Sequence, residues 1–125
     1  MQRYGRAPTP GSRQFAARAL LNKASILGER NESARDAILT YERIDRNFGN
    51  EKAPAIREVL ASALVSKAET LYKLGSAEKS LAVYDQLEQQ FGKDDNDFIK
   101  RLTDIAKWRA TEIRVNNNMV LSSRP

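Results

Sequence analysis

The stretch ALVSKAETLYKLGSAEKSLAVYDQLEQQFG, Ala63–Gly92, repeats in altered form an earlier stretch, ALLNKASILGERNESARDAILTYERIDRNFG, Ala19–Gly49. Each copy has Ala-Leu before Lys-Ala, then a break that contains Gly, then Tyr followed by an acid, and finally Phe-Gly. The Lys-Ala pairs are 44 residues apart, whereas Tyr41 and Tyr84 are 43 residues apart. A period of this length is typical of proteins built from stacked helical repeats. The repeat therefore predicts the fold class.

Each copy has the apolar spacing of two amphipathic helices. In the second copy, apolar residues recur at three- and four-residue steps on each side of Gly75, which marks one face of a helix. The two stripes are Leu60, Leu64, Ala68 and Leu71, and then Leu81, Tyr84, Leu87 and Phe91. A last stripe consists of Phe98, Leu102, Ile105 and Ile113. The pattern predicts five helices, near residues 13–30, 33–48, 54–74, 77–91 and 96–115, and no strand.

Polar residues that can cap helices stand where these helices are expected to start. Ser33 followed by Asp36 resembles a capping box, and Ser76 directly follows the glycine of the second break. The cap of the fifth helix is expected from the acidic cluster Asp94, Asp95 and Asp97. Capping explains this cluster better than a metal site, because the glycine and the distal glutamate of a calcium-binding loop are missing.

The segment KAETLYKLGSAEKSLAVYDQL, residues 67–87, resembles a tetratricopeptide repeat. The family's small residue, large apolar residue, inter-helix glycine and aromatic residue are matched by Ala68, Leu71, Gly75 and Tyr84. Ser80 and Leu87 depart from the pattern, because alanine is usual at both places. The family's usual period is 34 residues, so a period of 43–44 implies lengthened repeats. A HEAT-like array would have a similar period, but the spacing of Lys-Ala, Leu-Gly and Tyr-Asp favours the tetratricopeptide pattern.

The resemblance covers about residues 13–115 and implies an all-α, right-handed solenoid of antiparallel helix pairs. Two full repeats and a single C-terminal helix would make five helices. We expect residues 1–12 to form a flexible basic arm and residues 116–125 a disordered tail. Stacked helix pairs form a concave surface from the exposed sides of their first helices. The resemblance therefore implies a non-catalytic scaffold that binds a protein, as a peptide or a partner helix, in this groove.

The groove residues are expected beside the buried stripes of the first, third and fifth helices. They are Leu21, Ser25, Val65, Glu69, Tyr72, Lys73, Trp108 and Glu112. Leu21 and Val65 are explained at least as well as margins of the apolar stripes. Trp108 shares its face with charged residues, and an exposed Trp is a common interface anchor. The terminal helices carry more apolar residues than one neighbour would cover, so we also expect either self-association through these helices or a missing element that covers them.

The composition argues against catalysis. The chain has 125 residues without Cys or His, so a disulfide, a thiolate metal site and an imidazole proton shuttle are all excluded. Its glycines match no phosphate-binding loop. We therefore expect no enzyme activity, no cofactor and no metal. No apolar run approaches the length of a transmembrane helix, and we expect a cytoplasmic protein that does not enter membranes.

A basic N-terminal segment supports the main alternative, a nucleic-acid-binding accessory module. The net charge is +5, and residues 1–18 contain no acid but four arginines, Arg3, Arg6, Arg13 and Arg18. Nucleic acid is the less favoured partner, because most aromatic residues that could stack on bases lie on the core stripes. Residues 1–28, which contain no acid, also resemble a mitochondrial transit peptide, but residues 13–24 match residues 57–68, which favours a place in the folded array. A further alternative is a structural fragment of a longer repeat protein.

Overall fold

Helices account for most of the chain that the structure describes. The computed structural model describes residues 10–122, which form five α-helices and one short 3-10 helix, without a β-strand in this range. The helices are α1 (Pro10–Gly28), η1 (the 3-10 helix, Asn31–Ser33), α2 (Ala34–Phe48), α3 (Pro54–Lys73), α4 (Ala77–Phe91) and α5 (Asp97–Ser122). The predicted all-α class and the five α-helices are confirmed over the described residues.

Two predicted boundaries are wrong. α1 begins at Pro10, so residues 10–12 are helical rather than part of a flexible arm, and proline is well suited to a first helical turn. α5 continues to Ser122, although residues 116–125 were predicted to be a disordered tail. No Gly or Pro interrupts α5, and extending an existing helix is easier than nucleating one. The rest of the predicted arm and tail, residues 1–9 and 123–125, lies outside the described residues.

The glycine break between α3 and α4 is a Schellman motif. Gly75 has a φ of +86°, in the left-handed region that side chains disfavour. The N–H of Gly75 donates to the carbonyl oxygen of Tyr72 at 2.9 Å, and the N–H of Ser76 donates to that of Leu71 at 2.9 Å. These two bonds satisfy carbonyl groups at the end of α3 and turn the chain toward α4.

The predicted side-chain caps are not the ones in the structure. Neither Ser33 nor Ser76 caps its helix with its hydroxyl group, and Ser33 Oγ donates instead to the carbonyl oxygen of Leu27 at 2.6 Å. At the start of α5, Asn96 replaces the aspartates as the cap, because its Oδ1 accepts from the N–H of Ile99 at 3.0 Å. Asp94 supports this cap by accepting from the N–H of Asn96 at 2.9 Å.

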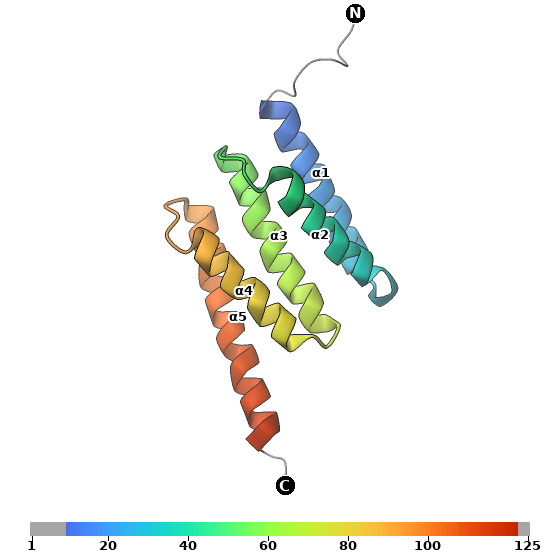
Figure 1. Cartoon of the computed structure of the whole chain (residues 1–125), viewed down its shortest axis with the longest axis vertical. Coiled ribbons are helices and arrows are strands. Elements are labelled where there is room, and N and C mark those ends of the chain that lie inside the picture. Colours follow the sequence, from blue (N-terminus) through green and yellow to red (C-terminus); the bar gives the residue numbers. More distant parts are fainter. Residues whose placement is uncertain (1–9, 123–125) are drawn as a thin grey trace, which may run out of the picture.

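α3 lies in the middle of the helices, with two crossed helices on each side of it. Figure 1 shows α2 crossing in front of α1 and α4 crossing in front of α5, with α3 between the two pairs. α3 contacts each of the other four α-helices. Within residues 10–122, neither α1 nor α2 has backbone contacts with α4 or α5. This arrangement is compatible with a helical solenoid, in which each repeat contacts only the repeats next to it.

The predicted apolar stripes of α3 and α4 form the core. The predicted stripe of α5 is wrong at Phe98 and Ile105, which are 38% and 46% exposed, because the buried side of α5 carries Ile99, Ala106 and Ala110 instead. Ala24 and Ala68, the small residues expected where helices approach closely, have no exposed surface, and the Tyr41 and Tyr84 rings are buried. Ser80 is also fully buried, and its Oγ donates to the carbonyl oxygen of Ala68 at 2.7 Å across the contact between α3 and α4. The hydroxyl that departs from the family pattern is therefore hydrogen-bonded, as a buried polar group must be.

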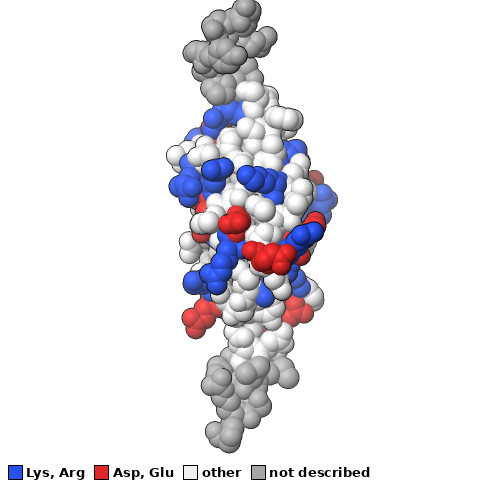
Figure 2. Space-filling view, turned by 90° about the vertical axis from the view of Figure 1, so that its right-hand side faces the viewer, with Lys and Arg blue, Asp and Glu red and all other residues white. Residues whose placement is uncertain are grey.

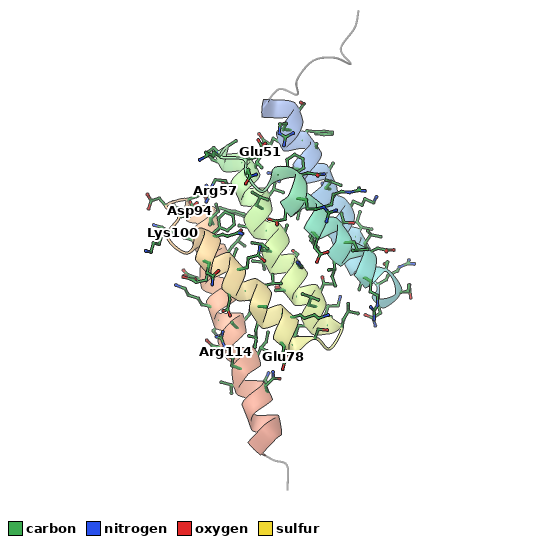
Figure 3. All side chains as sticks on the ribbon, in the orientation of Figure 1. Glu51, Arg57, Glu78, Asp94, Lys100 and Arg114 are labelled. Atoms are coloured by element: carbon green, nitrogen blue, oxygen red, sulfur yellow. The ribbon has the colours of Figure 1, made fainter. Side chains whose placement is uncertain are left out.

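Arg57 joins the start of α3 to the end of α4 and to the connection beyond it. Its guanidinium carbon lies 4.7 Å from the centre of the Phe91 ring, and its Nη2 lies 2.7 Å from Oδ2 of Asp94. Figure 3 shows Arg57 and Asp94 side by side at this end of the helices. A cation over an aromatic ring and a partly exposed ion pair each contribute about 1 kcal/mol or less. We call Arg57, Phe91 and Asp94 an arginine clamp.

The first repeat has an arginine clamp of its own. Arg13 lies 4.8 Å from the centre of the Phe48 ring and 2.8 Å from Oε2 of Glu51, and it also donates to the carbonyl oxygen of Asn47 at 3.0 Å. The three clamp residues precede their counterparts by 44, 43 and 43 positions, the offsets of the sequence repeat. The sequence repeat is therefore also a repeat of contacts.

Replacing Ala68 by tryptophan should destabilise the protein by about 1–3 kcal/mol or more, because overpacking a close helix contact forces the backbone to shift. Ala82→Trp is the matched control, since Ala82 is exposed on α4. Thermal unfolding followed by circular dichroism measures both variants. Equal melting temperatures for the two variants would contradict the close contact between α3 and α4.

Candidate functional site

Four of the eight predicted groove residues line one hollow between α3 and α5. Glu69, Tyr72 and Lys73 of α3 face Glu112 of α5 across a cavity of about 180 Å³. Its lining is completed by Tyr84, Arg109, Ile113 and Asn116. The repeat offset therefore brought together residues that are more than thirty positions apart in the sequence.

The other four predicted residues do not join this hollow. Val65 is buried in the core and Leu21 packs against the core, so both belong to the apolar stripes and neither is a groove residue. Ser25 is exposed on α1, and Trp108 is 62% exposed on α5, but neither lines the hollow. The single predicted groove along α1, α3 and α5 is thus wrong at Val65 and Leu21, because these side chains turn inward.

The charged groups in the hollow already have partners. Arg109 lies 3.8 Å from a carboxylate oxygen of Glu69 and 3.6 Å from one of Glu112. Lys73 Nζ donates to the carbonyl oxygen of Gly28 at 2.9 Å, which ties α3 to the end of α1. Burial raises the pKa of Tyr84, and the Glu69 charge acts in the same direction, so this phenol stays protonated near neutral pH. These contacts stabilise the junction and leave little unpaired charge for a ligand.

A larger groove lies between α2 and α4, with α3 as its floor. Its cavity volume is about 690 Å³, within the usual range for ligand sites. Its lining residues are Arg35, Ile38, Leu39, Glu42, Lys67, Leu71, Leu74, Ser76, Lys79, Ala82 and Val83. We call this the α2–α4 groove. It exists because the second helices of the two pairs, α2 and α4, both pack on α3 without a close approach of their backbones to each other.

The lining of the α2–α4 groove is apolar in the middle and basic at its edges. Leu39 is 61% exposed, the most exposed of the large apolar side chains here. Lys67 lies 3.2 Å from a carboxylate oxygen of Glu42, so this pair is neutral. Within residues 10–122, the structure shows no ion pair for Arg35 or Lys79, both of which are exposed. The groove therefore has two positive charges beside an apolar floor.

Sequence reasoning missed this groove, although one residue signalled it. The buried stripe of α2 contains Tyr41, Ile44 and Phe48, and Leu39 falls outside this stripe. A large apolar residue off the core stripe has no partner within its own helix pair, and such exposure often marks an interaction surface. The groove also exists only because α2 and α4 are apart, and the spacing of apolar residues in the sequence does not predict this separation.

The arginines proposed for nucleic-acid binding divide into three cases. Arg13 is held in the first arginine clamp, so its guanidinium is engaged within the fold. Arg18 is exposed on α1. Arg3 and Arg6 lie outside the described residues. Figure 2 shows Lys and Arg interspersed with Asp and Glu over the middle of one face, without a continuous basic stripe there.

The acidic cluster before α5 has a structural role. Asp94 belongs to the second arginine clamp and also accepts the Asn96 N–H. Within residues 10–122, no three Asp, Glu, His or Cys side chains are grouped in a way that could hold a metal ion. Within the same residues, no helix has both the length and the apolar character needed to cross a bilayer.

Comparisons with known proteins give no relative from which a function could be transferred. The chain matches no protein-family model, no curated protein and no solved structure.

The arginine clamp should make stability depend on pH in the acid range. The hydrogen bond from Arg57, followed by that from the Asn96 N–H, holds the pKa of Asp94 below its ordinary value of 3.8. A lowered pKa means that the charged carboxylate stabilises the folded state above about pH 4, and that this stabilisation is lost as the pH falls through the folded pKa. Asp94→Asn should therefore lower the unfolding free energy at pH 6 and make it less dependent on pH below about 4.

Urea unfolding at several pH values measures this dependence, with Asp95→Asn as the control because Asp95 is exposed. If the stability difference between Asp94→Asn and the parent protein is the same at pH 6 and pH 3, the clamp is not an ionic contact.

Proposed function

We propose that this chain is a non-catalytic protein-binding module, a lengthened tetratricopeptide-like repeat array. In this proposal the helix pairs α1–α2 and α3–α4 are antiparallel and stack as a right-handed solenoid, with α5 as the first helix of a third repeat. Support comes from the contacts of α3 with every other α-helix and from the two arginine clamps at repeat-equivalent positions. The absence of Cys from the whole sequence is compatible with the cytoplasmic location included in the proposal.

The α2–α4 groove is the proposed binding site. Its occupant is an amphipathic helix of a partner protein, with apolar side chains on one face and acidic residues beside them. The observation that carries this proposal is the combination of an apolar floor with exposed Arg35 and Lys79 at the edges. Carboxylates on the partner would neutralise these two charges, and its apolar side chains would cover Leu39.

The shape of the groove favours a short contact with one or two turns of a helix. Toward Glu42 the space narrows, because Gln86 of α4 lines the same cavity as Tyr41 of α2, and this cavity has a volume of only about 160 Å³. The wide part therefore extends from Arg35 to Glu42 along α2, which is two turns of an α-helix. A hydrophobic anchor from the partner would sit beside Leu39.

The alternative groove around Tyr72, Lys73 and Trp108 is less favoured for a physical reason. The charges of the hollow beside Tyr72 are already paired with one another, and its volume is about a quarter of that of the α2–α4 groove. A partner would have to break existing ion pairs to gain new ones. Nucleic-acid binding through Arg3, Arg6 and Arg18 is less favoured still, because Arg13 is engaged in the fold.

Selection of a displayed peptide library against the full chain tests the proposed site. We expect the selected peptides to be amphipathic and acidic. Leu39→Asp should weaken their binding tenfold or more, since it places a carboxylate against both the apolar and the acidic groups of the ligand; tenfold corresponds to about 1.4 kcal/mol. Fluorescence anisotropy of labelled peptides gives the dissociation constants.

The controls separate this site from the alternatives. Lys79→Glu should weaken binding, whereas Lys93→Glu should not, because Lys93 is exposed outside the groove. Binding that survives Leu39→Asp but is lost with Tyr72→Ala or Trp108→Ala would move the site to the α3–α5 side. Binding of a single-stranded oligonucleotide that Arg18→Ala weakens would favour the nucleic-acid alternative instead.

A further inference from the structure

The outward face of α1 has the same pattern as a face of α3 that is buried. At the repeat offset of 44, the α1 positions Phe15, Ala19 and Ile26 correspond to Val59, Ala63 and Thr70 of α3. The three α3 residues are 1–5% exposed, as α3 lies against α1 and α2. Phe15 and Ile26, by contrast, are 76% and 66% exposed, and Ala19 is exposed as well. The exposed side of α1 thus carries residues whose equivalents in α3 are buried in a helix–helix contact.

A charged residue on this face also has a counterpart with a known partner. Lys67 of α3 pairs with Glu42 of α2 at 3.2 Å, and both residues lie beside Ala63. Lys23 of α1 stands 44 positions before Lys67 and is exposed, with no ion pair in the described structure. The Lys67–Glu42 contact therefore indicates the chemistry that Lys23 is placed to meet, namely a carboxylate on a neighbouring helix.

The opposite end of the stack is different. At the offset of 43, the buried residues Leu64 and Leu71 of α3 correspond to Lys107 and Arg114 of α5. These two cations lie near the acids of α4, with Lys107 3.8 Å from Glu88 and Arg114 3.3 Å from Asp85. Figure 3 labels Arg114 on the lower half of α5. These ion pairs cover only part of the α5 end, because Phe98, Ile105, Trp108 and Val115 of α5 are 38–62% exposed.

We propose that the outward face of α1 is a second docking site, for an amphipathic helix of a partner that carries the pattern of α2. Its apolar residues would cover Phe15, Ala19 and Ile26, and a carboxylate at the place of Glu42 would pair with Lys23. This site is distinct from the α2–α4 groove, since the two surfaces lie on different helices and share no residue.

A second copy of this chain is not the proposed occupant. Its own α2 is engaged by α3, so it has no free helix of this pattern. A two-fold antiparallel contact that set Phe15 against Ile26 of the second copy would also bring Arg18 opposite Lys23, and like charges across a contact are unfavourable.

The experiment adds a second copy of α1 and α2, the helix pair that packs on α3. Residues 10–53 are duplicated and inserted directly before Pro10 of the full chain, which keeps the natural join, because Pro10 and Pro54 stand at the same repeat position. The added α2 then lies next to the original α1. We expect a single cooperative unfolding transition with a melting temperature raised by about 5 °C or more, as a new interface between neighbouring repeats is formed.

Two substitutions in the original α1 distinguish docking from a general effect of the insertion. Ala19→Trp and Lys23→Glu should leave the parent protein unchanged, because both residues are exposed there. In the extended protein, each should lower the melting temperature by about 2 °C or more. A separate low-temperature transition for the added pair, or equal effects of the substitutions in both proteins, would overturn the proposal. So would a dimer of the parent chain that Ala19→Trp abolishes.

Discussion

The packing of the other four α-helices on α3 is the contact on which the arrangement of the repeats depends, and an arginine clamp fixes the end of each helix pair. Each clamp joins the start of the first helix of a pair to the Phe side chain at the end of the second helix. It also joins that start to an acidic residue in the connection to the following helix. One side chain thus fixes three segments at the point where two repeats meet. Arginine suits this role because its planar guanidinium can lie on an aromatic face while its edge meets a carboxylate. Small residues at Ala24 and Ala68 then allow the helices to approach closely.

The two surfaces proposed for binding follow from this arrangement. α2 and α4 each pack on α3, and because their backbones do not approach each other closely, the α2–α4 groove stays open above α3. The outward face of α1 has the pattern of a buried face because α1 and α3 are equivalent helices. Both proposed binding surfaces are ones that no helix within residues 10–122 covers. The hollow beside Tyr72 is less suited to binding, because its carboxylates are already paired with Arg109.

The sequence predicted the parts of the structure that depend on local pattern. The stripes of α3 and α4, the break at Gly75 and the small residues Ala24 and Ala68 are all properties of short spacings, and they are found as expected. The outcome for Arg13 was different. Its match to Arg57 favoured a place in the folded array, but its contact with Glu51 was not predicted, because this ion-pair partner lies 38 residues further along the chain.

The candidate site was half predicted for a similar reason. The repeat offset placed Tyr72, Lys73 and Glu112 together. It did not tell which side chains at the edge of a stripe are buried, so Val65 and Leu21 were wrongly assigned to a groove.

A double-mutant cycle on Arg57 and Asp94 tests most directly whether the clamp holds the repeat junction. Unfolding free energies of Arg57→Ala, Asp94→Ala and the double variant should give a coupling energy of about 0.5–1 kcal/mol or more, because the two side chains are in contact and partly buried. Additive effects, with a coupling energy below about 0.3 kcal/mol, would contradict the account.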